Sequence, residues 1–217
     1  MSPAYGFDRY TAHGGPVRGL ALSPDGSTLV TASFDYSAVV WGTQALEEQA
    51  TLLGHEAAVN TAAFSADGSL LATAGDDGSV LLWTREQIGN DSAEPVVLQG
   101  HKGKVVNLAF SSDGTMLASA SWDGSIGIWP LAGTGLDESQ SARFIAGHEG
   151  PVNAVQFSDN NEYLYSAGYD GQIRYWRLQN DEYLRSPVRN GWGVSVFMVD
   201  EKADLVAYGG SDGQMVI

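Results

Sequence analysis

The sequence predicts an all-β fold made of repeated, four-stranded antiparallel sheets. Short apolar runs rich in Val, Leu and Ala alternate with polar turns that contain Gly, Asp, Asn or Pro, as expected for strands joined by tight turns. A unit of this kind, clearest in Gly54–Trp83, returns along the chain in a constant register. Such a period indicates one sheet per repeat, with neighbouring sheets packed against each other.

Four repeats share a His, a hydroxyl residue, an Asp and a Trp at the same spacing. The Asp follows the His by 22 residues, and the Trp follows the Asp by 6. A fifth copy starts at Asn190 and keeps Asp212 at the same distance, but Tyr208 replaces the hydroxyl residue. Repeat starts are 42 to 47 residues apart, a period typical of β-propeller blades. The four sets are His13, Thr31, Asp35 and Trp41; His55, Thr73, Asp77 and Trp83; His101, Ser119, Asp123 and Trp129; His148, Ser166, Asp170 and Trp176.

Turn residues divide each repeat into its strands. In the first repeat, Pro24 and Gly26 end the first strand, and the turn around Asp35 ends the second. The third strand runs to the Trp, and an apolar run just before the next Gly-His pair predicts the fourth. The predicted strands are Val17–Leu22, Thr28–Ser33, Ala38–Trp41 and Ala50–Leu53; Val59–Ser65, Leu70–Ala74, Ser79–Trp83 and Val96–Leu98; Val105–Ser111, Met116–Ala120, Ser125–Trp129 and Arg143–Ile145; Val152–Ser158, Tyr163–Ala167, Gln172–Trp176 and Leu184–Pro187; Val194–Val199, Leu205–Tyr208 and Gln214–Ile217.

Four other segments carry weaker signals. Gly6–Thr11 is predicted to be a further strand, and Ala45–Gln49 to form one helical turn at most. The polar loops Thr84–Pro95 and Pro130–Ala142 are longer than their counterpart in the first repeat. Gly and Ser in the second of these loops predict mobility.

This pattern resembles the WD-repeat family of β-propellers over almost the whole chain, from about Phe7 to Ile217. One departure is general, because Gly42, Thr84, Pro130 or Arg177 follows the Trp where the family has Asp. The resemblance implies blades around a central channel, usually seven, with Gly6–Thr11 completing the last blade. Because about five repeats are present and the fifth is cut short, we expect residues 1–217 to form one domain that is an incomplete seven-bladed propeller. A closed five-bladed ring is the alternative.

The resemblance also implies that each His, hydroxyl residue, Asp and Trp form one hydrogen-bonded network inside their blade. We therefore expect a structural role for these residues and no metal site, since the four His lie on separate blades. A Ser, His and Asp constellation also suggests a hydrolase, but a nucleophile site occurs once and this set recurs with the repeat. We expect Asp77→Asn to lower stability without abolishing any specific binding.

Composition excludes several classes of function. The chain has 217 residues, no Cys, 11 basic and 26 acidic side chains, and a formal net charge of −15. Such acidity argues against binding to nucleic acids or anionic membranes. The absence of Cys removes disulfides, thiolate metal sites and Cys nucleophiles. No apolar run approaches the roughly 18 residues of a membrane span, and residues 1–12 lack the apolar core of a signal peptide.

A binding face is predicted around the mouth of the channel, where the resemblance places the Gly-His loops and the Asp turns together. Aromatic residues are unusual in such loops and are enriched in protein interfaces. The opposite face, with loops 84–95 and 130–142, is the second candidate. The predicted protein-binding residues of the channel face are Arg18, Phe34, Tyr36, Asn60, Asp76, Trp122, Asn153, Tyr169 and Trp192, with Asn107 and Ser211 nearby.

These observations predict a scaffold that binds proteins and is not an enzyme. We expect no catalytic residues, no cofactor and no metal, and a protein partner in place of a small-molecule substrate, nucleic acid or membrane. The alternative is the propeller part of a bacterial c-type cytochrome protein, because SASWDGSIGIW and SAGYDGQIRYW look similar to such proteins. Its haem motif would lie beyond Ile217. A cytoplasmic location is the default, and a periplasmic one follows from the alternative.

Overall fold

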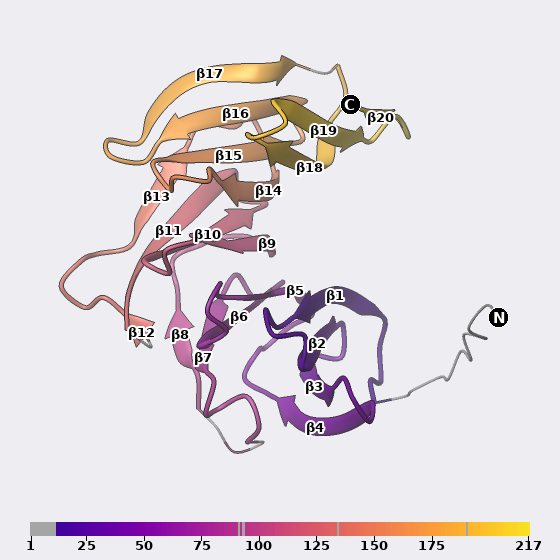
Figure 1. The fold of residues 1–217 in the computed structure, drawn as a ribbon. Helices are drawn as coiled ribbons and strands as arrows, with labels where there is room; N and C mark the ends of the chain where they lie inside the picture. Colours follow the sequence, from indigo (N-terminus) through magenta and orange to yellow (C-terminus); the bar gives the residue numbers. More distant parts are fainter. Residues whose placement is uncertain (1–11, 91, 93, 134, 190) are drawn as a thin grey trace.

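The chain forms strands throughout the part that the structure describes. The computed structural model describes residues 12–217 except 91, 93, 134 and 190 (Figure 1). The side chains of residues 186–189 are also outside the description. The predicted strand Gly6–Thr11 lies outside the described residues. Within the described ranges there are twenty strands and no helix, and hence no helix that could span a membrane. The predicted all-β class is confirmed.

The strands form five antiparallel sheets, and each begins with the strand that follows a Gly-His loop or its equivalent. The first sheet has the order β1-β2-β3-β4, and the second has the order β5-β6-β7-β8. Polar turns join consecutive strands, and Gly26 closes the first of these turns with a φ of 69° that favours glycine. The strands are β1 (Val17–Leu22), β2 (Thr28–Ser33), β3 (Ala38–Gly42), β4 (Glu47–Leu52), β5 (Val59–Phe64), β6 (Leu70–Gly75), β7 (Val80–Thr84) and β8 (Val96–Leu98).

The remaining sheets follow the same plan with two variations. The third sheet has an additional strand, and the fifth has three strands in place of four. The strands are β9 (Val105–Phe110), β10 (Met116–Ser121), β11 (Ser125–Ala132), β12 (Gly135–Leu136) and β13 (Arg143–Ala146); β14 (Val152–Phe157), β15 (Tyr163–Gly168), β16 (Gln172–Arg177) and β17 (Glu182–Arg189); β18 (Val194–Asp200), β19 (Leu205–Gly210) and β20 (Met215–Val216).

Two predicted connections contain more strand than the sequence indicated. The segment Ala45–Gln49 forms no helical turn, because Glu47 and Glu48 already pair with β3 and begin β4. The predicted mobile loop Pro130–Ala142 contains a short hairpin, because β11 continues past Trp129 and β12 pairs with its end. In both segments backbone pairing with a neighbouring strand overrides the local sequence signal.

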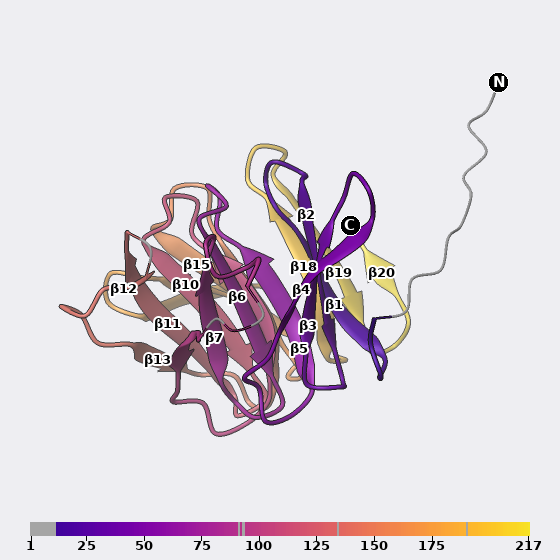
Figure 2. The ribbon, with the colours of Figure 1, turned by 90° about the horizontal axis from the view of Figure 1, so that it is seen from below.

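The five sheets fan out side by side around a shared centre (Figures 1 and 2). Their first strands, β1, β5, β9, β14 and β18, pack against one another in succession and form the inner edge of the fan. The later strands of each sheet lie progressively farther out (Figure 1). This is the arrangement of propeller blades, and the first and fifth sheets stand at the two ends of the fan (Figure 1).

The apolar core lies between consecutive sheets. Trp83 packs against the first sheet, Trp129 against the second and Trp176 against the third, each in a cluster of buried aliphatic side chains. Burial of one such aromatic side chain contributes about 1.5–3 kcal/mol. The cluster between the fourth and fifth sheets is smaller and contains Ala154, Ala167, Ile173 and Val194. The fifth sheet therefore has the weakest apolar attachment.

Both ends of the fan expose apolar side chains. At one end, Leu20 and Leu22 of β1 are exposed, and Trp41 is only partly buried, unlike the three tryptophans that meet a preceding sheet. At the other end, Met198 and Met215 are exposed on the fifth sheet. The end sheets thus present surfaces like those that the interior sheets bury against each other.

Candidate functional site

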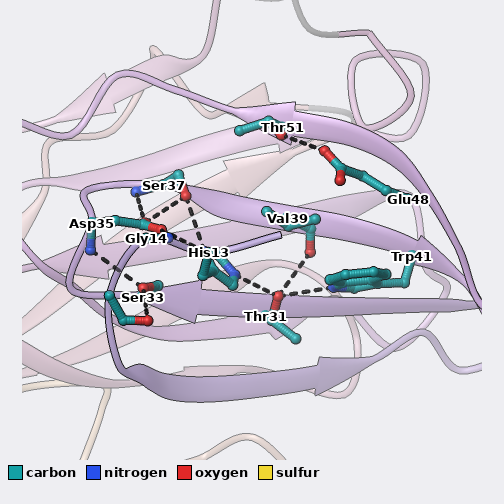
Figure 3. Close-up of polar contacts among 11 residues, drawn as sticks. His13, Gly14, Thr31, Ser33, Asp35, Ser37, Val39, Trp41, Glu48 and Thr51 are labelled. Atoms are coloured by element: carbon teal, nitrogen blue, oxygen red, sulfur yellow. Dashed lines mark hydrogen bonds and ion pairs between the residues drawn. The ribbon is translucent and has the colours of Figure 1, made fainter. Parts of the chain in front are cut away.

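A hydrogen-bonded network connects the four shared residues of the first repeat (Figure 3). His13 Nδ1 lies 2.9 Å from Asp35 Oδ2, and His13 Nε2 lies 2.7 Å from Thr31 Oγ1. Trp41 Nε1 donates to the same Thr31 oxygen at 2.9 Å. The carboxylate requires a proton on Nδ1, so the Thr31 hydroxyl donates to Nε2 and accepts from the indole. Every donor in this network therefore has an acceptor.

The other three sets are connected in the same way. The distances from His Nδ1 to the Asp carboxylate, from His Nε2 to the hydroxyl and from the indole to the hydroxyl are 2.8, 3.0 and 3.2 Å in the second repeat. They are 3.1, 2.7 and 2.9 Å in the third repeat, and 2.9, 2.7 and 2.8 Å in the fourth. Each network ties the loop before a first strand to the second and third strands of that sheet.

Each Asp also accepts a backbone N–H that the sequence did not indicate. The amide after the His donates to the carboxylate in all four repeats, from Gly14, Glu56, Lys102 and Glu149. The fourth set has a further cation, because Arg174 Nη2 lies 3.1 Å from Asp170 Oδ2 and its guanidinium lies over the rings of Trp176 and Tyr183. These bonds fix the protonation state of the carboxylates as well as their position.

The networks shift the pKa values of their titratable groups. Burial acts to raise the pKa of Asp35, but hydrogen bonds from Ser37, His13 and Gly14 outweigh it and lower this pKa to about 2. For Asp123 burial is likewise outweighed, by bonds from Ser125 and Lys102 and by the charge of His101, and its pKa is also about 2. Burial lowers the pKa of His101 and His148, although the neighbouring carboxylates oppose that change.

The network hydroxyls are inaccessible to a substrate. Thr31, Thr73, Ser119 and Ser166 are buried in their sheets, and each accepts the indole N–H of its Trp. A nucleophile must reach a carbonyl carbon from an open side of the hydroxyl. The arrangement is therefore suited to hold the sheet together. No group of three or more His, Cys, Asp or Glu that could hold a metal ion occurs among the described residues.

The fifth repeat lacks the same constellation in the part that is described. Asn190 lies outside the described residues. Tyr208 packs against the small cluster between the fourth and fifth sheets, and the Asp212 side chain accepts from the Gln214 amide within its own turn.

The predicted aromatic residues are all exposed. Phe34, Tyr36, Trp122, Tyr169 and Trp192 each expose between 41% and 62% of their surface, on loops at the start or end of first and second strands. The rings of Trp122 and Tyr169 meet edge to face with centroids 6.3 Å apart, so turns of the third and fourth sheets present one joint aromatic surface. Lys104 lies over Trp122 and forms an ion pair with Asp76, at the edge of this surface.

Beside the aromatic pair lies a cavity of about 510 Å³ at the centre of the fan. Its lining includes Trp122, Tyr169 and side chains from the first strands of all five sheets. In each of these strands the pairing with the second strand skips one residue, which forms a β-bulge. The five skipped residues are Arg18, Asn60, Val106, Asn153 and Ser195, and all of them line the cavity.

Two of these bulged residues act between sheets. Asn60 Nδ2 donates to the carbonyl of Val105 at 3.1 Å, and Asn153 Nδ2 donates to the carbonyl of Val194 at 2.8 Å. Each amide thus reaches the residue just before the next bulge. Both residues therefore connect neighbouring blades. Asn60 is buried and its amide also donates to Asp76, so both of its N–H groups are used inside the protein.

Val106 and Ser195 were missed from the sequence. Neither has an unusual side chain, but both stand five positions after the start of their repeat, as Arg18, Asn60 and Asn153 do. The constant register was therefore the one signal that could have found them. Asn107 lies one position later, and its side chain accepts the Val155 amide of the next blade at 2.9 Å.

Five fanned antiparallel sheets with a repeated internal network and a central cavity define a propeller-type repeat protein. The family model described as WD domain, G-beta repeat matches residues 7–42, 46–84, 94–130 and 139–177. These segments cover more than half of the chain, so it belongs to the WD-repeat family. The match contains four repeats, and the fifth sheet lies outside it. A comparison with curated proteins gave no match.

Proposed function

We propose that this chain is a non-catalytic scaffold that binds protein partners through the aromatic face of the fan. WD repeats generally mediate protein–protein interaction, and that role is typical of the family to which the chain belongs. The observation that carries the assignment to this face is the exposed pair Trp122 and Tyr169, which stands beside the central cavity. Large aromatic side chains in such positions are the usual anchors of protein interfaces.

Physical reasons favour this face over the opposite one. On the opposite side, Ile88 of loop 84–95 is buried, and part of loop 130–142 is paired in the β11–β12 hairpin. The aromatic face instead offers rings from several sheets, which remain exposed while their backbones are fixed by the networks. A rigid backbone with exposed rings loses little conformational entropy on binding.

We infer that the five sheets are part of a ring with further blades, and we propose seven in total as in most members of the family. Support comes from the exposed Leu20 and Leu22 at one end of the fan and Met198 and Met215 at the other. Leu20 corresponds to the buried Leu108 and Val155 of interior sheets, and Met215 corresponds to the buried Ile126 and Ile173. The cytochrome-linked alternative has no support from the family match, which is to the repeat family as a whole.

The test is capture of partners on immobilised protein, with quantitative mass spectrometry of the bound fraction. Trp122→Ala combined with Tyr169→Ala should remove most of the specifically bound proteins. The matched control, Val96→Ala combined with Val97→Ala, changes two exposed apolar residues on the outer strand β8 and should retain them. Retention of every partner by the aromatic double variant, with an unchanged urea midpoint, would place the contact surface elsewhere.

A further inference from the structure

Arg18 differs from the other four bulged residues in charge. Among the described residues that line the central cavity, it is the one charged side chain, whereas Asn60, Val106, Asn153 and Ser195 are neutral. All five are placed by the same backbone irregularity, so their side chains start from equivalent positions in their sheets. At the bulged position, the first sheet therefore differs from the others in its side chain and not in its backbone geometry.

Arg18 also lacks the structural role of Asn60 and Asn153. Asn60 and Asn153 bind a backbone carbonyl of the next sheet, but Arg18 forms no ion pair or hydrogen bond through its side chain with any described residue. Four other arginines, Arg85, Arg143, Arg174 and Arg177, each form an ion pair with a carboxylate of this acidic chain, whereas Arg18 forms none among the described residues. Arg18 is exposed and faces the cavity as a free donor of hydrogen bonds.

The geometry points to a carboxylate receptor at this position. This inference rests on the proposed function and specifies the partner: a peptide segment with an Asp or Glu side chain next to an apolar one. The carboxylate binds the Arg18 guanidinium, whose planar group of N–H donors matches a carboxylate in two parallel bonds. The apolar neighbour packs on Trp122 and Tyr169, which line the same cavity.

A carboxylate fits this site better than a phosphate does. A phosphorylated residue carries a charge of about −1.5 to −2 and is normally held by several cations. Lys104 is the other cation at the aromatic pair, and it is already neutralised by Asp76 and lies over Trp122. One free guanidinium therefore matches one carboxylate. The net charge of −15 makes nucleic acid an unsuitable source of the anion.

The probe for the experiment is a phage-displayed library of random linear peptides, selected on the intact chain. Wild-type protein should enrich peptides with Asp or Glu beside an aromatic or aliphatic residue. Synthetic copies of these peptides should lose roughly tenfold to hundredfold in affinity with Arg18→Ala, as expected for one charge-assisted contact, and by a similar factor when Gln replaces their acidic residue. In the double-mutant cycle these two losses should not add.

Three further variants sharpen the test. Arg18→Asn introduces the residue that Asn60 and Asn153 use between sheets, so it should keep the melting temperature and still lose the acidic preference. Arg18→Glu should instead select basic peptides. Arg185→Ala removes the same charge from β17 and should leave peptide binding unchanged.

Several outcomes overturn the inference. The inference fails if the enriched peptides show no acidic preference, or if Arg18→Ala binds them with unchanged affinity. Loss of binding in Trp122→Ala would then still support the aromatic face. Tighter binding of phosphorylated peptides than of their acidic counterparts would replace carboxylate with phosphate. A library without any binder overturns peptide recognition at Arg18, whereas the capture experiment still decides the proposed function.

Discussion

Tyr36 and Gly78 occupy equivalent positions in consecutive blades, and both have left-handed backbone conformations with φ of 73° and 77°. The third, fourth and fifth sheets also have glycine there, at Gly124, Gly171 and Gly213. An L-residue in this region is less stable by roughly 1–2 kcal/mol, so Tyr36 is held in a strained turn on the aromatic face.

Tyr36→Gly should therefore stabilise the protein. Relief of strain is partly offset by the greater freedom of glycine in the unfolded chain, which leaves a net gain of roughly 0.5–1 kcal/mol in the free energy of unfolding. Urea titration measures this gain. The reverse control is Gly213→Ala, where a Cβ would meet no atom within 4 Å and only the backbone strain is added. A stability loss in Tyr36→Gly would show that the ring makes contacts that exceed the strain. If Tyr36 also contacts a partner, the more stable variant should bind that partner less tightly.

Asp77→Asn should lower stability by about 1–3 kcal/mol. The Asp77 carboxylate accepts hydrogen bonds from His55, from the Glu56 amide and from both the amide and hydroxyl of Ser79. An amide side chain offers one acceptor oxygen and turns an N–H₂ group toward the remaining donors. Urea unfolding measures this loss of stability. The control is Glu56→Gln, which removes the same charge one residue after His55 without removing a side-chain hydrogen bond. An equal effect of both variants would mean that charge alone matters.

Stability should fall in two stages as the pH decreases. The folded-state pKa values of His101 and His148 lie below the ordinary value of 6.5, so unfolded chains bind more protons and stability declines as the pH falls below about 6.5. The second stage begins below pH 4, because Asp35 and Asp123 have folded-state pKa values of about 2. Urea midpoints between neutral and acidic pH, together with NMR titration of the imidazoles, measure this dependence. Stability that rises between neutral pH and the onset of carboxylate protonation would contradict the first stage.

Gln156→Ala should loosen the fifth sheet. Gln156 Nε2 donates to the Val199 carbonyl at 2.7 Å, and its Oε1 accepts the Val199 amide at 3.0 Å. The equivalent residues of the first three repeats are Ala21, Ala63 and Ala109. The substitution therefore introduces the residue that those repeats already have at this position. Because the apolar cluster at this sheet is small, amides of β18 and β19 should exchange with solvent faster than in wild-type protein. Gln179→Ala, on an exposed residue, is the control and should leave exchange unchanged. If the amides of β18 and β19 exchange equally slowly in both variants, apolar packing alone holds this sheet in place.

The sheets could be predicted from the sequence because their information is local and repeated. Turn residues such as Pro24 and Gly26 mark strand ends, and the spacing from His55 to Asp77 recurs in every repeat. The strands β1, β2 and β8 have the predicted bounds. The His, hydroxyl residue, Asp and Trp of each network recur at a constant spacing. This spacing located them even though they are far apart in the sequence.

The irregular features could not be predicted in the same way. A β-bulge at Arg18 or Val106 depends on how two strands pair, and the composition of either strand carries no sign of it. The bonds of Asn60 and Gln156 connect different sheets, and their partners are backbone groups that any residue could supply. The role of the aromatic face in partner binding stays a prediction, because exposure alone does not identify what covers it.

Because the bulge recurs in every sheet, the side chains that line the central cavity can differ in chemistry without a change in the backbone. Each blade contributes one lining residue from the same irregularity, and the surrounding ladder does not depend on whether that residue is arginine, asparagine, valine or serine. Selectivity can therefore diverge through single substitutions at these positions while the architecture persists. A new partner would therefore require different side chains at these five positions, on an unchanged backbone.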